Sequence, residues 1–92
     1  MTIKVRFFAQ FREFFGTDIV IDAVPGTSFI DLIKKIAENN PKKYDAIFDT
    51  NGEFHNFVIL MKNGVRIDYA EAGKIIINDG DEIAVFPPVA GG

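Results

Sequence analysis

The chain has 92 residues, of which 48% are hydrophobic and none is cysteine, and its formal net charge is −3. This length predicts one domain, because a single core usually serves about 100 to 200 residues. The lack of cysteine excludes disulfides, reactive thiolates and cysteine metal sites. The basic residues form no stripe of the kind that binds nucleic acid, and no apolar run suits a signal peptide or the roughly 20 residues of a membrane span. We therefore expect a small cytoplasmic domain that binds neither nucleic acid nor membrane.

The N-terminal part of the chain predicts two strands joined by a short connection. Residues 2–9 alternate between apolar and polar side chains, which is typical of a strand with one buried face. Residues 11–18 hold three phenylalanines at helical spacing, and they indicate either one short turn of helix or a structured loop. Residues 18–24 favour a second strand that ends at Pro25-Gly26. The phenylalanines that we expect in the core are Phe7, Phe29 and one of Phe11 and Phe14.

The clearest element is a helix within residues 27–40. Its apolar side chains recur at the spacing i, i+3, i+4 and i+7: Phe29, Leu32, Ile33 and Ile36. Thr27 or Ser28 can cap the start of this helix, and Pro41 prevents it from simply running on. The pattern predicts one apolar stripe that packs on a sheet.

The second half of the chain predicts shorter elements. Residues 40–56 are the least regular segment, in which a short helix starting at Pro41 and a turn at Asn51-Gly52 are the best predictions. Residues 57–67 predict a strand, a turn at Asn63-Gly64 and a return strand. The sequence therefore ends its body with β-structure.

The last strand follows a turn at Asp79-Gly80 and ends near Phe86. Its alternation predicts that Ile83 and Val85 point into the core and that Phe86 points outward. Pairing should stop at Pro87, because proline has no N–H to donate to a ladder.

The order of strand, strand, helix and further strands predicts an α+β fold, a mixed sheet packed on one main helix. The compact form of this order is the ubiquitin-like β-grasp. A ferredoxin-like fold fits less well, because it requires a long helix directly after its first strand. We expect the β-grasp domain to span residues 1–86 and a flexible, extended C-terminal tail to span residues 87–92.

The sequence offers little for catalysis. Its only histidine is His55, in a polar loop where a solvated residue is more common than a general base. The glycines are scattered in turns and form no phosphate-binding loop. The segment from Asp79 to Glu82 resembles a fragment of a calcium loop but lacks the spacing and the final bidentate glutamate. We therefore expect no catalytic residue, no metal site and no bound cofactor.

The C-terminal tail is the segment with a chemical interpretation. Pro-Pro favours an extended chain, and the side chains then shrink through Val89 and Ala90 to two glycines. A tapering end suits a narrow channel in a partner. Gly92 would carry the reacting carboxylate, and Gly91 would leave clearance, because glycine has no Cβ. The alternative is that the two glycines are an ordinary frayed end.

The sequence also predicts a surface for partners. Phe8 lies on the outer face of the first strand and Phe86 on the outer face of the last, and these strands are neighbours in a β-grasp sheet. The two rings should form one exposed apolar patch, unless the 40–56 segment covers one of them. The predicted partner-binding residues are Phe8, Phe86, Pro87, Pro88, Val89 and Ala90.

Two motifs bracket the chain, VRFFAQFREFFGTD near the start and DGDEIAVFPPVAGG at the end. Both resemble closely the small subunit of molybdopterin synthase, the MoaD-like family, over almost the whole chain. Sulfur carriers of the thiamine pathway, which are ThiS-like, share the fold and Gly-Gly but typically lack Phe-Pro-Pro. Small archaeal modifier proteins share the Phe-Pro-Pro and the Gly-Gly.

The resemblance implies that an activating enzyme, using ATP and magnesium, adenylates the carboxylate of Gly92 and that sulfur converts it to a thiocarboxylate. It implies that the tail then enters the large subunit of molybdopterin synthase, which transfers the sulfur. In the modifier members, the activated glycine is joined instead to a lysine of a target protein. The chain itself would be a monomer when free and would not be an enzyme. A plain interaction domain with an idle tail remains the alternative from another class.

Overall fold

The fold is built on a five-stranded mixed sheet with the strand order β2-β1-β5-β3-β4. The strands are β1 (Thr2–Phe7), β2 (Asp18–Asp22), β3 (Ile59–Lys62), β4 (Val65–Ile67) and β5 (Glu82–Phe86). The central strands β1 and β5 run parallel, and the other neighbours are antiparallel. The computed structural model describes residues 1–87. It confirms the α+β architecture.

The connection between the first two strands is helical. Helix α1 (Ala9–Phe15) buries Phe11 and ends at Gly16, whose φ of 96° is accessible to glycine without strain. The placement of Phe8 within the first strand was wrong. The strand ends at Phe7, and Phe8 is the N-cap of α1, because its carbonyl already accepts hydrogen bonds from the N–H groups of Phe11 and Arg12.

Helix α2 (Phe29–Ala37) is the predicted amphipathic helix. Ser28 Oγ accepts a hydrogen bond from the N–H of Asp31 at 3.2 Å, so the serine is the N-cap. The buried residues of the helix are Phe29, Leu32, Ile33 and Ala37. Ile36, expected in the stripe, is only half-buried. The stripe packs on the sheet, whose inward side chains Ile3, Val5 and Phe7 are fully buried.

The 40–56 segment is a compact part of the core. Helix α3 (Pro41–Ile47) begins at Pro41, as the sequence predicted. Its N-cap is Asn40, whose Oδ1 accepts a hydrogen bond from the N–H of Lys43 at 3.3 Å. After α3 the chain turns back, and Phe48 and Phe54 form an isolated antiparallel bridge. Their rings lie 4.8 Å apart, and the ring of Phe54 also meets Phe29 of α2 at 6.1 Å. Aromatic packing therefore joins this segment to the main helix.

The hairpin of β3 and β4 turns at Asn63-Gly64, as predicted. A short 3₁₀ helix, η1 (Tyr69–Glu71), follows β4 and was not predicted. It begins at Asp68, whose carboxylate accepts from the N–H of Ala70 at 2.9 Å. Three residues are too few for a hydrophobic period to appear in the sequence. Beyond η1, Ala72 and Ile77 return to the core.

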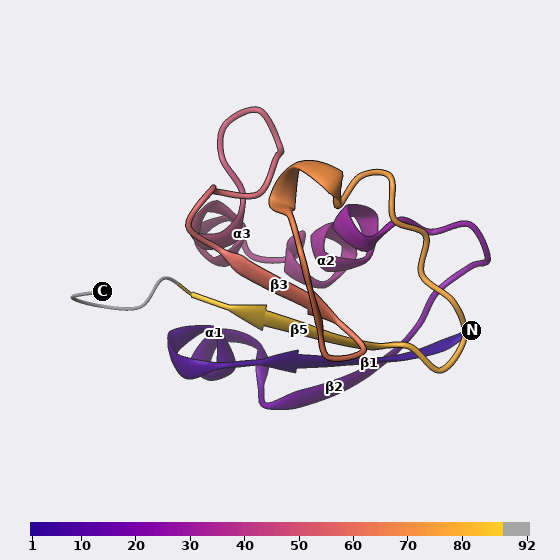
Figure 1. Cartoon of the computed structure of the whole chain (residues 1–92). Coiled ribbons are helices and arrows are strands. Elements are labelled where there is room, and N and C mark those ends of the chain that lie inside the picture. Colours follow the sequence, from indigo (N-terminus) through magenta and orange to yellow (C-terminus); the bar gives the residue numbers. More distant parts are fainter. Residues whose placement is uncertain (88–92) are drawn as a thin grey trace.

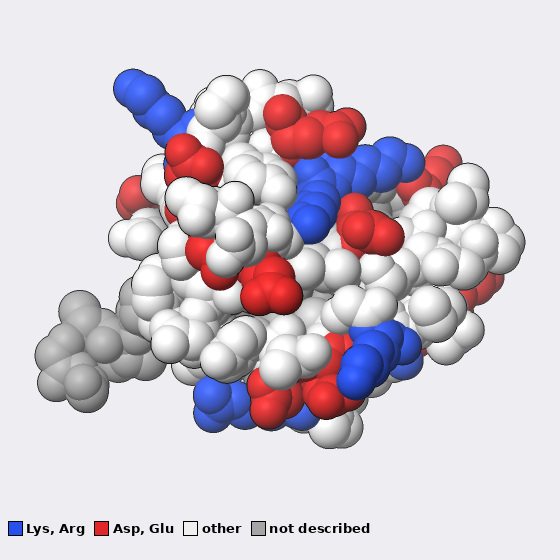
Figure 2. All heavy atoms as spheres, turned by 90° about the horizontal axis from the view of Figure 1, so that it is seen from above, with Lys and Arg blue, Asp and Glu red and all other residues white. Residues whose placement is uncertain are grey.

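Helices α2 and α3 cover one face of the sheet, and α1 lies beside the C-terminal ends of the central strands β1 and β5 (Figure 1). The parallel pairing of β1 and β5 puts the N-terminus and the end of β5 at opposite ends of the domain. Seen from the helix side, acidic and basic side chains are interspersed, and neither sign forms a continuous field on this face (Figure 2). This distribution agrees with the lack of a basic stripe in the sequence.

Candidate functional site at the root of the C-terminal tail

The end of β5 is the place from which the C-terminal tail leaves the sheet. The parallel register pairs Phe7 with Val85, and the N–H of Phe8 donates to the carbonyl of Val85 at 3.3 Å. These contacts hold the start of α1 against the last residue pair of the β1–β5 ladder. The rings of Phe8 and Phe86 consequently stack, with centroids 4.1 Å apart and planes inclined by 8°.

The outer face of the sheet continues this aromatic pair as an apolar surface. Ile59 lies opposite Phe86, and Met61 lies opposite Ala84, in the antiparallel ladder of β3 and β5. All of them are half-buried, whereas the alternate residues Ile83 and Val85 are fully buried on the inner face. We call this surface the tail-root patch; it consists of Phe8, Ile59, Met61, Ala84 and Phe86. The sequence did not identify its β3 members, because residues 57–61 are all apolar and show no alternation that would separate the two faces.

Charged residues border the patch on the β1 side. Arg6 Nε lies 2.8 Å from Asp18 Oδ1 on β2, and Arg6 Nη1 lies 3.7 Å from Glu82 Oε1 on β5. The hydrogen bond and the charge of Asp18 raise the pKa of Arg6, and the hydrogen bond from Arg6 lowers the pKa of Asp18. Arg6 lies between the two carboxylates across adjacent strands, so the apolar patch has a paired ionic margin whose net charge is −1.

The start of β5 is anchored by Asp81, which is only 8% exposed. Its carboxylate accepts from the N–H of Asn78 at 2.7 Å and from Asn63 Nδ2 at 2.9 Å, and Lys62 Nζ lies at 3.6 Å. Burial opposes ionisation of Asp81, but these hydrogen bonds and the lysine outweigh it, and the pKa of the carboxyl is lowered. The network joins the β3–β4 turn to β5 and so orients the strand that carries the tail.

The structure brings together only part of the predicted site. Phe8 and Phe86 lie side by side, as expected. Pro87 follows β5 directly and is buried. The remaining predicted positions, Pro88, Val89, Ala90, Gly91 and Gly92, lie outside the described residues. Their roles, and those of the two phenylalanines in partner binding, remain predictions.

No other group of described residues competes with the tail as a chemical site. Within residues 1–87, no three histidine, aspartate or glutamate side chains gather where they could hold a metal ion. His55 Nε2 donates to the carbonyl of Asp45 at 2.8 Å, and its ring stacks on Phe57 at 4.8 Å. His55 therefore has a structural role in tying its loop to α3. In the same part of the chain, no helix is both long and apolar enough to span a bilayer.

Comparison with known proteins identifies the fold and the family. Residues 5–92 match the ThiS family. The chain is 32% identical to small archaeal modifier protein 3 of Haloferax volcanii, with complete coverage of both chains. It is also 32% identical to the molybdopterin synthase sulfur carrier subunit of Escherichia coli, over 98% of this chain and 99% of that one. The crystal structure of SAMP1 from Haloferax volcanii superposes with a TM-score of 0.84 at 25% identity, over all of both chains.

These likenesses confirm the ubiquitin-like β-grasp. These relatives are named as a small modifier protein and a sulfur carrier subunit, so the prediction that the chain is not an enzyme is also supported. The chain belongs to the ThiS family and is a ubiquitin-like carrier or modifier protein.

Proposed function

We propose that the chain is a sulfur carrier of the molybdopterin synthase type, with the carboxylate of Gly92 as its reactive group. The observation that carries this proposal is the family match, which extends through the terminal Gly91-Gly92. The full-length similarity to a molybdopterin synthase sulfur carrier subunit supports the pathway.

The chemistry follows from the poor reactivity of a carboxylate. An oxygen of the Gly92 carboxylate attacks the α-phosphorus of ATP, pyrophosphate leaves, and an acyl adenylate forms. Hydrosulfide, the sulfide-level product of a sulfur donor, then attacks the carbonyl carbon and expels AMP, and loss of the S–H proton leaves Gly92 as a thiocarboxylate. ATP, magnesium and the catalytic groups belong to the activating enzyme. The large subunit of molybdopterin synthase would receive the sulfur.

The described part of the chain would supply recognition. The tail-root patch is apolar, lies where the tail leaves the sheet, and has a paired ionic margin. Aromatic side chains often provide most of the binding energy of an interface. A partner that docks there would hold the root of the tail in place while residues 88–92 enter its active site. This arrangement separates binding, which the patch performs, from chemistry at Gly92.

A second candidate function is protein modification through the same activated glycine. The chain is as similar to small archaeal modifier protein 3 as to the molybdopterin synthase subunit. In this case the amine of a target lysine attacks the activated carbonyl of Gly92, the leaving group departs, and an isopeptide bond forms. The two functions share the activation step and differ only in the acceptor.

The test is the intact mass of the purified chain after incubation with lysate of its host, ATP and a sulfur donor. Exchange of one oxygen for sulfur at Gly92 is the expected result. Species of higher mass, with Gly92 joined to lysines, would instead favour protein modification. A matched variant that lacks only Gly92 should undergo neither reaction and should melt at the same temperature as the complete chain. An unchanged mass in an active lysate would overturn both functions and favour a plain interaction domain.

A further inference from the structure

The sheet ends on one side in β4, a strand of three residues whose outer edge pairs with no described strand. The turn that precedes it has φ of 51° at Asn63 and 81° at Gly64, which is the type I′ geometry of a two-residue hairpin. In such a hairpin the flanking residues, Lys62 and Val65, form a hydrogen-bonded pair. The pairs alternate along an antiparallel ladder, so Arg66 forms the non-hydrogen-bonded pair with Met61. The backbone N–H and C=O of Arg66 therefore point outward, away from the sheet.

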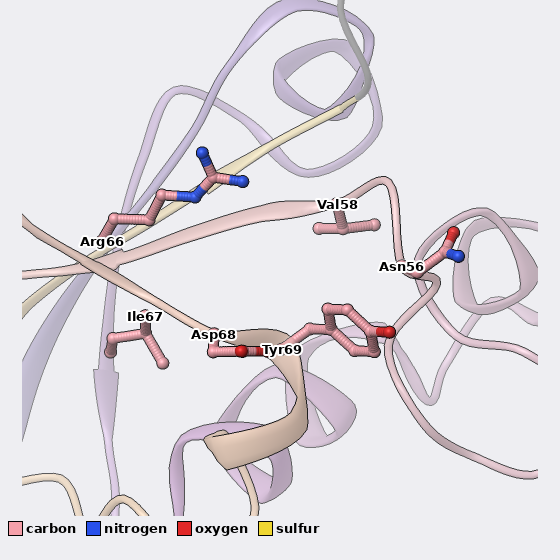
Figure 3. Close-up of a pocket in the computed structure, with 6 residues that line it drawn as sticks. All are labelled: Asn56, Val58, Arg66, Ile67, Asp68 and Tyr69. Atoms are coloured by element: carbon pink, nitrogen blue, oxygen red, sulfur yellow. The ribbon is translucent and has the colours of Figure 1, made fainter.

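Two hollows adjoin this edge. One of about 440 Å³ lies where β3 and the chain after β4 diverge, and its lining is Asn56, Val58, Arg66, Ile67, Asp68 and Tyr69 (Figure 3). The other, of about 410 Å³, lies beside the hairpin turn and is lined by Lys62, Asn63, Val65, Ile67 and Ile75. Ile67 belongs to both linings. The edge thus combines an outward donor and acceptor with two hollows that share the buried Ile67. The hollow beside the turn is mainly apolar, and the other has polar and apolar lining in similar measure, with Val58 and Ile67 as its aliphatic part.

Arg66 is the one charged residue of β4, and its cation is unpaired among the described residues, while Asp68 after the strand carries a negative charge. The guanidinium of Arg66 forms no ion pair with a described carboxylate. The nearest acid along the strand, Asp68, caps η1 with its carboxylate, and in Figure 3 the Arg66 guanidinium points away from it. Since the ladder pairs Arg66 with Met61, the Arg66 side chain lies on the outer face, and those of Val65 and Ile67 lie on the opposite face.

We infer that the β4 edge is a docking site for an extended segment of a partner protein in which an acidic residue stands between two aliphatic residues. Such a segment would add a strand to the sheet through the backbone groups of Arg66. Side chains two residues apart in a strand lie about 6.6 Å apart on one face, which lets both aliphatic groups enter the hollows. The acidic side chain between them would then face the Arg66 guanidinium.

Charge favours this proposal over two alternatives, a second copy of the chain at β4 and the same segment at the β2 edge. Antiparallel pairing of two β4 edges about Arg66 would place two guanidiniums together, which disfavours a second copy of the chain. The opposite edge strand, β2, contains no cation to pair with an acidic segment, and its two charged residues are Asp18, which already pairs with Arg6, and Asp22. The inference does not rest on the tail, so a chain that lacks Gly92 should bind such a segment unchanged.

The test uses the full chain labelled with ¹⁵N and two blocked pentapeptides, Thr-Val-Glu-Val-Thr and its matched form Thr-Val-Lys-Val-Thr. The glutamate peptide should cause saturable shifts concentrated in the amide signals of Val65, Arg66 and Ile67 and should slow hydrogen exchange at Arg66. Its affinity should exceed that of the lysine peptide and should fall about fivefold or more in Arg66→Glu, as expected for the loss of a favourable charge pair of about 1 kcal/mol. N-methylation of the peptide's central residue should abolish binding without any change in the protein.

Several results would overturn the inference. These are equal binding of the two peptides, shifts concentrated instead at Asp18–Asp22 or at the tail-root patch, or shifts that inorganic phosphate alone reproduces. Shifts at β4 that appear on concentrating the protein without peptide would identify contact between two copies. Each result can be read whether or not Gly92 is activated, so failure here is distinguishable from failure of the proposed function.

Discussion

Phe8 and Phe86 come from opposite ends of the sequence and stack face to face, with ring centroids 4.1 Å apart. The stack depends on the parallel pairing of β1 with β5, because the N–H of Phe8 donates to the carbonyl of Val85 next to Phe86. Because aromatic quadrupoles favour offset or edge-to-face pairs over a face-to-face stack, this pair contributes chiefly through the apolar surface that the two rings bury against each other. The pair therefore stabilises the end of β5 as well as forming the tail-root patch.

We expect Phe86→Ala to slow the conversion of Gly92 by lysate, ATP and a sulfur donor about fivefold or more, because an aromatic anchor at an interface is worth more than about 1 kcal/mol. The rate of the mass change measures this effect. Val20→Ala is the matched control, since Val20 is 68% exposed and lies on β2 in the same sheet. An unaltered rate in a folded Phe86→Ala variant would exclude the patch as the docking surface.

The Phe48–Phe54 bridge predicts a large stability effect within the 40–56 segment. Phe54 is 2% exposed and contacts the rings of Phe29 and Phe48. Phe54→Ala should lower the free energy of unfolding by about 3–5 kcal/mol, as loss of a buried phenylalanine does. Phe57→Ala, at a ring that is 45% exposed, should cost about 1 kcal/mol or less. Denaturation in guanidinium chloride measures both, and equal losses would contradict the core role of Phe54.

Asp81 predicts a loss of stability in acid. Its pKa in the folded chain is lowered by hydrogen bonds from Asn78 and Asn63 and by Lys62, in spite of burial. The stabilisation is therefore fully present above the pKa of an unfolded aspartate, about 3.9, and is lost as pH falls through the folded value. Asp81→Asn should reduce the free energy of unfolding at pH 7 by about 1–3 kcal/mol.

Urea denaturation of the unaltered protein and of Asp81→Asn between pH 7 and pH 2.5 tests the direction of this pH dependence. The difference between them should shrink below about pH 4. As a control, Glu71→Gln removes a carboxylate from an exposed pair with Lys74, whose atoms are 4.0 Å apart, and should change the free energy of unfolding at pH 7 by less than about 1 kcal/mol. A difference that grows in acid would mean that ionised Asp81 destabilises the fold.

Asn63 combines two roles that substitutions can separate. Its φ of 51° is left-handed, and its side chain donates to Asp81 and accepts from the N–H of Glu82 at 2.9 Å. Asn63→Gly keeps the backbone geometry and removes both hydrogen bonds, whereas Asn63→Ala loses both features. We expect alanine to be less stable than glycine by about 1 kcal/mol, the cost of left-handed backbone for a residue with a Cβ. Thermal unfolding of the three proteins measures this difference, and equal stability of the two variants would show that the turn has relaxed.

Periodic patterns predicted the elements whose side chains contact one face of the sheet. The stripe of α2 and the alternation in β1 and β5 could be predicted because burial on one side imposes a period on the sequence. The Asn63-Gly64 hairpin was predicted instead from residues that favour positive φ. The assignment of chemistry to Gly91 and Gly92 lies outside the described residues and stays a prediction. Short or irregular segments carried no such period, which is why η1 was missed and α1 remained one of two options.

The strand order and the turns determined which residues distant in sequence come into contact. The continuous apolar run of β3 gave no indication that Ile59 and Met61 would complete the tail-root patch, because that depends on which strand pairs with β5. Phe8 lies outside β1 because α1 starts there, yet its ring still stacks on Phe86 because β1 and β5 pair in parallel. The outward backbone groups of Arg66 arise from the register set by a two-residue turn. Periodicity in a chain records which side chains are buried, whereas the partner that each strand meets follows from how the whole chain closes around its core.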